Sequence, residues 1–115
     1  MTIRIKNLRL RAIIGTREWE RTQKQDILVN IAIEFDGIPA ARSDDLRDSV
    51  DYAAIKHRLL EKVEQTEFLL LERLVEYILD LVMEEPKVQS ATVEVDKPHA
   101  LRFADSVSIT STRRR

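Results

Sequence analysis

Residues 27–35 read Ile-Leu-Val-Asn-Ile-Ala-Ile-Glu-Phe, and apolar side chains occupy positions 27, 29, 31, 33 and 35 without a break. Asn30, Ala32 and Glu34 fall on the other face. A period of two residues is typical of a strand that buries one face in the core and leaves the other face polar. The segment from Gly37 to Pro39 ends this strand, because both residue types interrupt regular structure.

Three more strands are predicted around it. Residues 3–14 alternate, but the apolar set changes parity between Ile5 and Leu8, which indicates a bulge near Lys6-Asn7. Residues 91–96 and 106–110 alternate in the same way near the end of the chain.

Two helices are predicted in the middle of the chain. The first follows a cap at Ser49 or Asp51 and presents one stripe of side chains, made of Tyr52, Ile55, Leu59 and Val63. Residues 65–67 break this helix. The second helix begins near Leu71 and runs at helical apolar spacing to about residues 84–85, before Pro86.

The resulting order is strand-strand-helix-helix-strand-strand (β-β-α-α-β-β), with the helices kept together. It predicts an α+β domain of residues 1–115, in which two helices cover one face of a four-stranded antiparallel sheet. The uncovered face would carry Arg9, Arg11, Asn30, Glu34, Thr92, Glu94, Ser106 and Ser108. Because edge strands need protection, this sheet is expected either to be solvated or to pack inside an oligomer such as a closed ring.

Composition excludes several classes of function. The chain has 19 Lys and Arg against 20 Asp and Glu, so it lacks the basic excess of a nucleic-acid-binding protein. It has no cysteine, which removes disulfides, thiolate nucleophiles and cysteine-ligated zinc. Its only histidines are His57 and His99, so one chain cannot form a three-histidine zinc site.

The sequence gives no sign of a membrane or exported protein. No apolar stretch approaches the roughly 18 residues that cross a bilayer, and residues 1–6 alternate isoleucine with charge, unlike a signal peptide. A cytoplasmic protein is therefore expected. The terminal Arg113-Arg114-Arg115 is predicted to be a solvated tail.

Glu72 is the first candidate for a binding group. It falls in the first turn of the second helix, where the helix dipole stabilises a carboxylate and the free backbone N–H groups lie beside it. Two acceptor oxygens and a donor at one point complement the edge of a 2-amino-4-oxo pyrimidine ring, as found in guanine or a pterin. The alternative is that Glu72 only satisfies its own helix terminus.

Three other residues are candidates for chemistry. Lys97 stands at a strand end before Pro98, where partial burial would let it act as an acid or base, although it could be an ordinary surface lysine. Glu20 offers a carboxylate in the turn of residues 15–25, which could also be simply solvated. Tyr52 begins a helix and could be a core aromatic with its hydroxyl at the rim.

Taken together and in this order, these features resemble the dihydroneopterin aldolase family of the tunnelling fold (T-fold). The match runs from about Ile3 to Thr110 and is carried by Ile14-Gly15, Trp19-Glu20, Gln25, Asp51-Tyr52, Leu70-Leu71-Glu72 and Lys97-Pro98. Within that family, residues 3–11 and 99–108 are similar to the dihydroneopterin triphosphate 2′-epimerase branch. The absence of zinc ligands separates the chain from the zinc enzymes of the fold, so no metal or cofactor is expected.

The resemblance implies an assembly and a set of roles. Four subunits would join their sheets into a ring, and two rings would stack as a homo-octamer, with pterin sites between subunits. Glu72 and the backbone around Leu71 would anchor the pterin ring, and Tyr52 would come from the adjacent subunit. Lys97 and Glu20 would act on the pterin side chain.

The resemblance also implies a reaction, the inversion of C2′ in 7,8-dihydroneopterin triphosphate by retro-aldol cleavage and re-addition. Lys97 would protonate N5, and Glu20, through water, would deprotonate the 2′-hydroxyl. His99 and Arg102 are expected to contact the phosphates, although Arg102 could instead pair with Asp105. The alternatives are an aldolase that releases 6-hydroxymethyl-7,8-dihydropterin and glycolaldehyde, and a ring protein that binds a pterin or purine without turnover.

Overall fold

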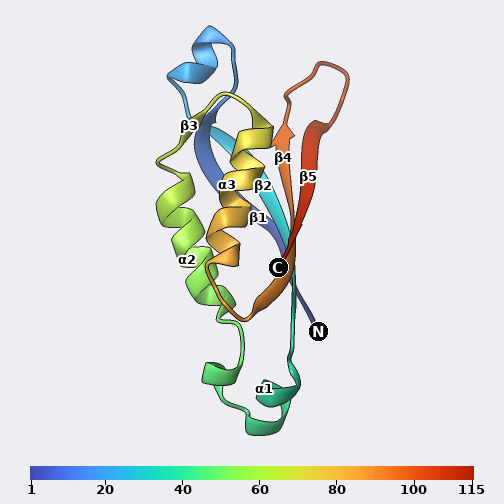
Figure 1. Ribbon diagram of the computed structural model, residues 1–115. Coiled ribbons are helices and arrows are strands. Elements are labelled where there is room, and N and C mark those ends of the chain that lie inside the picture. Colours follow the sequence, from blue (N-terminus) through green and yellow to red (C-terminus); the bar gives the residue numbers. More distant parts are fainter.

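Five strands form one sheet in the order β3-β1-β2-β4-β5, one strand more than the sequence predicts. The computed structural model describes all 115 residues (Figure 1). In chain order the elements are β1 (Thr2–Ile14), the 3-10 turn η1 (Glu18–Arg21), β2 (Gln25–Phe35), α1 (Ile38–Ser43), the 3-10 turn η2 (Leu46–Asp48), α2 (Tyr52–Val63), β3 (Glu67–Phe68), α3 (Leu71–Met83), β4 (Val88–Pro98) and β5 (Ser106–Arg114).

The additional strand, β3, is only two residues long. It pairs in parallel with the end of β1, where Ile13 lies opposite Glu67 and Ile14 opposite Phe68. Two residues are too few to show an alternating pattern, so the sequence indicates only a helix break there. The other pairs, β1 with β2, β2 with β4 and β4 with β5, are antiparallel as predicted.

The predicted bulge in β1 is confirmed. The register between β1 and β2 shifts between Ile5 and Leu8, and Asn7 has a left-handed φ of 53°. Asparagine tolerates this conformation better than most residues. Its backbone N–H donates to the Asn30 side-chain oxygen at 2.9 Å. As a result, the apolar residues before and after the bulge face the same side of the sheet.

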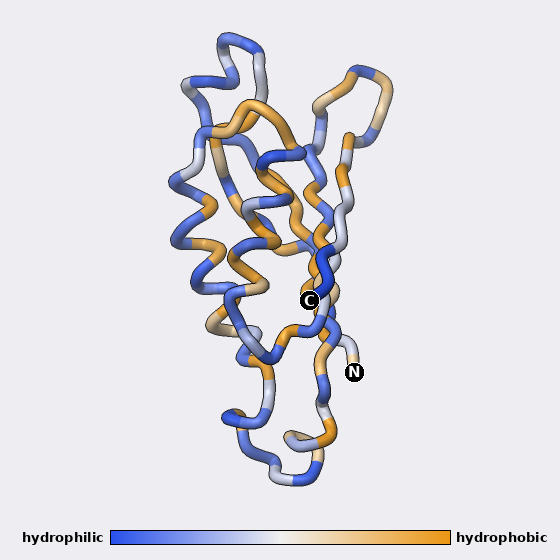
Figure 2. Tube along the Cα trace, viewed as in Figure 1, coloured by the Kyte–Doolittle hydropathy of each residue, from blue (hydrophilic) through white to orange (hydrophobic).

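The two long helices lie on one face of the sheet, as predicted (Figure 1). The core between them contains 22 buried apolar residues, all but Val50 from β1, β2, β4, α2 and α3. Along α2 and α3 hydrophobic and hydrophilic residues alternate with the turns of the helix (Figure 2), so that each helix turns its apolar side to the sheet. None of the helices is long and apolar enough to span a membrane.

Helix α2, the first of the two predicted helices, departs from its predicted apolar stripe at one residue. Ile55, Leu59 and Val63 are buried, but Tyr52 is 60% exposed, because it is the first residue of α2 and lies before the part of the helix that is covered. Of the two predicted caps, Asp51 is the one used, and its carboxylate accepts the Ala54 N–H at 3.1 Å.

The C-terminal arginines are not a solvated tail, which corrects the expectation from the sequence. β5 continues to Arg114, which lies opposite Ser90 of β4. The Arg113 guanidinium forms ion pairs with Glu76 and Asp80 of α3. Arg115 donates to the backbone oxygens of Val88, Met83 and Glu85, at 2.6, 2.5 and 3.0 Å. Acids on α3 and unpaired carbonyls near its C-terminus thus hold these cations.

The opposite sheet face is polar, as predicted. Thr92 bonds Thr112 across β4 and β5 at 2.8 Å, and the Ser108 hydroxyl donates to Glu94 at 3.2 Å. The sheet ends in β5 on one side. On the other side β3 covers only the last two residues of β1, so the rest of β1 is also an edge.

Candidate active site

One cavity of about 350 Å³ gathers five of the seven residues predicted for the site. Its walls come from the loop after β1, the first residue of β2, the start of α3, the end of β4 and the start of β5. The parallel pairing of β3 with β1 brings the start of α3 beside Gly15. The predicted residues in this active-site cavity are Glu20, Leu71, Glu72, Lys97 and His99.

Lys97 and Glu20 form a buried ion pair in the active-site cavity. Lys97 Nζ lies 2.5 Å from Glu20 Oε2, and the two side chains are only 11% and 7% exposed. Gln25 completes the arrangement, because its amide donates to Glu20 Oε2 at 3.0 Å and to the Ile14 carbonyl at 2.8 Å. The Arg17 backbone N–H donates to the other carboxylate oxygen at 3.2 Å.

These contacts determine the charge of Glu20. Burial raises the pKa of Glu20, but the hydrogen bonds from Lys97, Gln25 and the Arg17 N–H lower it more, so that the net pKa is about 2. Glu20 is therefore a carboxylate at neutral pH. It is a weak base while Lys97 holds it.

Gly15 makes room for the Glu20 carboxylate. Its φ is +127°, a conformation that side chains disfavour, and a Cβ at this position would lie 2.3 Å from the Glu20 carboxyl carbon. Glycine is thus required both by the backbone turn and by the close approach of Glu20.

Arg21 fixes the same loop to β3. Its guanidinium donates to the carbonyls of Gly15 at 2.9 Å, Phe68 at 3.0 Å and Glu67 at 2.5 Å. Sequence reasoning does not identify this residue, because its partners are backbone atoms and β3 is not predicted. Arg21 holds two walls of the active-site cavity at a fixed separation.

The start of α3 provides the other end of the active-site cavity. The first helical N–H bonds are those of Arg73 and Leu74 to the Leu70 carbonyl, at 3.1 and 3.2 Å, so the N–H groups of Leu71 and Glu72 make no intrahelical bond. The exposed Glu72 side chain forms no ion pair within the chain. The free N–H donors of Leu71 and Glu72 therefore lie beside the free carboxylate oxygens of Glu72, which is the arrangement that the sequence predicts for binding the edge of a heterocycle.

Two predicted site residues do not line the cavity of the single chain. Tyr52 begins α2, whose first turn lies toward the other end of the molecule from the β4–β5 loop (Figure 1). Arg102 lies in that exposed loop, with its guanidinium 5.4 Å from the centre of the Phe103 ring. It forms no ion pair with Asp105. The loop carries two residues with left-handed φ, His99 at 60° and Phe103 at 68°.

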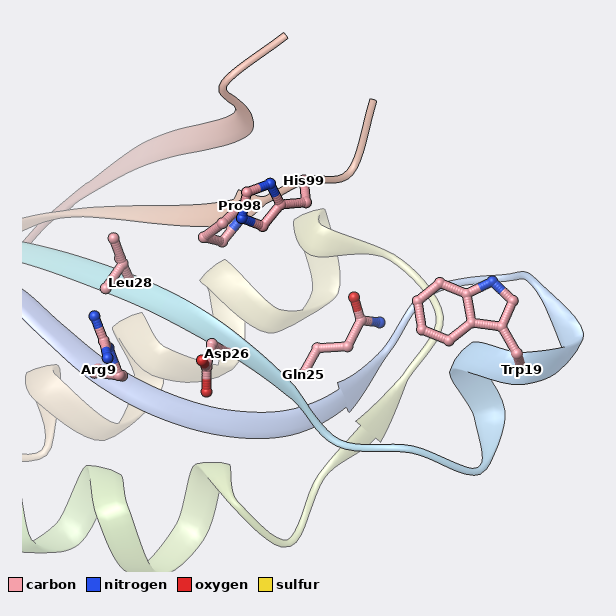
Figure 3. Close-up of a pocket in the computed structure, with 7 residues that line it drawn as sticks. All are labelled: Arg9, Trp19, Gln25, Asp26, Leu28, Pro98 and His99. Atoms are coloured by element: carbon pink, nitrogen blue, oxygen red, sulfur yellow. The ribbon is translucent and has the colours of Figure 1, made fainter. Parts of the chain in front are cut away.

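A second cavity, of about 370 Å³, adjoins the first. It shares Trp19, Gln25 and His99 with the active-site cavity and extends over the open sheet face to Arg9, Asp26, Leu28 and Pro98. Figure 3 shows Arg9 and Leu28 on β1 and β2, Pro98 and His99 at the end of β4, and Trp19 in the loop after β1. The sequence places Arg9 on this face but gives no sign that it adjoins the site.

Comparisons with known proteins agree with this arrangement. The family model for dihydroneopterin aldolase (FolB) matches residues 3–112. The dihydroneopterin triphosphate 2′-epimerase of Pseudomonas aeruginosa is 51% identical over 94% of this chain and 88% of that protein. The epimerase of the same description from Escherichia coli K12 is 45% identical over 94% of this chain and 90% of that protein.

Aldolases are less similar in sequence but share the fold. The dihydroneopterin aldolase of Escherichia coli K12 is 30% identical over 91% of this chain and 86% of that protein. The crystal structure of the Escherichia coli aldolase in complex with neopterin superposes with a TM-score of 0.93 at 29% identity and covers 98% of each chain.

Proposed function

Because the chain belongs to the dihydroneopterin aldolase family, we propose that it is a dihydroneopterin triphosphate 2′-epimerase, an enzyme that inverts C2′ of its substrate to give dihydromonapterin triphosphate. Its fold is the α+β T-fold of that family, with five strands in place of the four predicted. We take residues 1–115 as one pterin-binding domain.

The observation that carries this proposal is a single cavity with a ring-binding end and a proton-transfer end. Glu72 and the free N–H groups beside it complement the 2-amino-4-oxo edge of a pterin. Lys97 and Glu20 lie in the same cavity. A pterin bound at Glu72 would extend its side chain toward this pair.

The proposed reaction begins at N5, to which Lys97 gives its proton. Glu20, through a water molecule, takes the proton of the 2′-hydroxyl; the C1′–C2′ bond then breaks, and its electrons pass through C6 to the protonated N5. The aldehyde fragment, which carries C2′, C3′ and the phosphates, turns over and re-adds to C1′ through its other face as both protons return. Each proton transfer contributes about 10²–10⁴-fold. The ring accepts the electrons, so neither a Schiff base nor a metal is part of this proposal.

The ion pair couples the two proton transfers. Hydrogen bonds, the one from Lys97 foremost, hold the pKa of Glu20 at about 2, against the effect of burial. When Lys97 gives its proton to N5 it loses its positive charge, and the pKa of Glu20 rises because a buried carboxylate without a cation is disfavoured. Glu20 therefore becomes a stronger base at the moment when the 2′-hydroxyl must lose its proton.

Sequence similarity favours epimerase over aldolase. The two relatives described as epimerases are 51% and 45% identical to this chain, whereas the Escherichia coli aldolase is 30% identical. Both activities share the same bond cleavage and differ in whether the aldehyde fragment stays. The third possibility, binding without turnover, is disfavoured by the buried pair of Lys97 and Glu20, because pterin binding alone does not require it.

Incubation of the protein with 7,8-dihydroneopterin and its triphosphate, followed by chromatography of the pterins, tests the proposal. The epimer of the triphosphate should be the main product, and Lys97→Ala should lower turnover about 10²–10⁴-fold. Lys87→Ala, in the turn just before β4 begins, is the matched control and should keep full activity. Formation of 6-hydroxymethyl-7,8-dihydropterin alone would identify an aldolase, and binding without any product would identify a non-catalytic ring protein.

The assembly is part of the same proposal. We expect the exposed edges of β1 and β5 to pair between subunits in rings of four, and two rings to stack as an octamer in the cytoplasm. Such a ring would allow the exposed Tyr52 of one subunit to complete the site of its neighbour.

A further inference from the structure

The second cavity, next to the active-site cavity, has a free cation at its far side. Arg9 lines it, and its guanidinium forms no ion pair or hydrogen bond within the chain. The neighbouring charged side chains on the same sheet face, in contrast, pair with each other. Arg11 pairs with Asp26 at 3.2 Å and also donates to the Lys24 carbonyl at 3.2 Å. The charge of Asp26 is therefore offset by Arg11, which leaves Arg9 as the unpaired charge of this cavity.

The two cavities lie next to each other and share part of their walls. Gln25, which holds the Glu20 carboxylate, belongs to the walls of both, as do Trp19 and His99. A substrate with its ring at Glu72 and its reacting carbons at Lys97 and Glu20 would pass Gln25 and His99 before its far end reaches Arg9. A volume of about 370 Å³ lies within the range of cavities that hold small ligands.

We propose that the cavity lined by Arg9 and His99 binds the phosphate groups of the substrate side chain, with Arg9 as the principal contact. A guanidinium offers paired N–H donors that fit phosphate oxygens, and its charge is permanent. This inference rests on the proposed function and refines it, because Arg102 lines neither cavity, whereas Arg9 lines one of them.

The same contact would favour epimerisation over cleavage. In the retro-aldol step the phosphates leave with the aldehyde fragment, because C3′ carries them. A fragment held by Arg9 stays beside C1′ and re-adds, whereas an unheld fragment diffuses away as product. Arg9 thereby becomes a specificity residue of the reaction and a determinant of its outcome.

The test compares Arg9→Gln with Arg4→Gln, since Arg4 lies on the same strand and sheet face but lines a separate cavity. For Arg9→Gln, the KM for dihydroneopterin triphosphate should rise about 10- to 100-fold relative to the KM for unphosphorylated dihydroneopterin. The share of cleavage product should rise with it. Arg9→Lys should fall between wild type and Arg9→Gln, and Arg4→Gln should behave as wild type.

Calorimetry with inorganic triphosphate provides a second measurement that does not depend on turnover. The wild type should bind this probe, and Arg9→Gln should bind it at least about 10-fold more weakly. Equal binding by both proteins, or a KM change of the same size for both substrates, would overturn the inference. If the wild type neither epimerises nor cleaves either substrate, the proposed function fails. This binding measurement still decides whether Arg9 binds phosphate groups.

Discussion

At the residue scale, Gly15 has the most stringent requirement. Gly15→Ala should lower kcat at least about 100-fold and destabilise the fold by about 1–3 kcal/mol, because the backbone is left-handed and the new methyl would displace the Glu20 carboxylate. Gly37→Ala is the matched control, since its φ is not left-handed and its Cβ would lie nearest to the exposed Met1 side chain. Kinetics and thermal unfolding of both variants check this expectation, and equal effects would refute it.

Glu20 should make stability depend on pH in a defined window. Its pKa is about 2 in the folded protein against an ordinary value of 4.5, so its contribution is complete above pH 4.5 and is lost as the pH falls toward 2. The free energy of unfolding of the wild type should exceed that of Glu20→Gln by about 2–3 kcal/mol near pH 7.

Urea denaturation between pH 7 and pH 2 measures this difference. The gap between wild type and Glu20→Gln should narrow as Glu20 takes up its proton, because below both pKa values the ionised pair no longer exists. Glu18→Gln, at an exposed position in the same turn, should show no such gap. A gap that stays constant over the whole range would exclude the ion pair as its source.

At the scale of elements, the link between η1 and β3 positions the active-site cavity. Arg21→Ala should increase hydrogen exchange at residues 67–70 and lower kcat/KM about 10-fold or more, because three backbone carbonyls lose their common donor. Arg42→Ala, in the exposed last turn of α1, is the control. Unchanged exchange in the Arg21 variant would show that β3 holds the loop without it.

The elements also show what the sequence can and cannot predict. Alternation identifies β1, β2, β4 and β5, and it even locates the bulge, because each strand has one buried face. Alternation misses β3, because two residues are too few to show a repeating pattern. The helical pattern places Tyr52 on the buried stripe of α2, but the first turn of that helix extends beyond the part covered by the sheet. The C-terminal arginines look solvated in sequence because their partners, on α3 and in the segment that leads from it into β4, are about 30 residues away.

Prediction of the site depended on resemblance more than on pattern. Glu72 can be recognised from its place in a helix, but nothing local shows that Lys97 lies against Glu20, 77 residues earlier in the chain. Arg21 and Arg9 escape notice for the same reason. Arg21 acts through carbonyls of β3, and Arg9 lines a cavity together with residues of β2 and β4. Long-range register, which single-sequence patterns do not encode, decides which side chains share a cavity.

At the scale of the whole molecule, the proposed ring can be tested by mixing subunits. Lys97→Ala and Tyr52→Ala should each be nearly inactive alone. If the two residues act in one site from different subunits, co-expressed mixtures should regain activity, with about one site in four intact in a random equal mixture. Light scattering gives the size of the assembly. Mixtures no more active than their parents would place Tyr52 outside the neighbouring site.

The left-handed Asn7 has a consequence for the design of related proteins. The bulge adds one residue to β1 and so reverses which face of the sheet each later side chain occupies. Arg4 and Arg9 therefore lie on the same face although they are five positions apart. Removing one residue at the bulge would rotate residues 8–14 by half a turn, carrying Arg9 into the apolar interior and exposing its neighbours. If this site is transferred to another scaffold, the bulge at Asn7 must be transferred with it. Without the bulge, Arg9 would lie on the opposite face of the sheet.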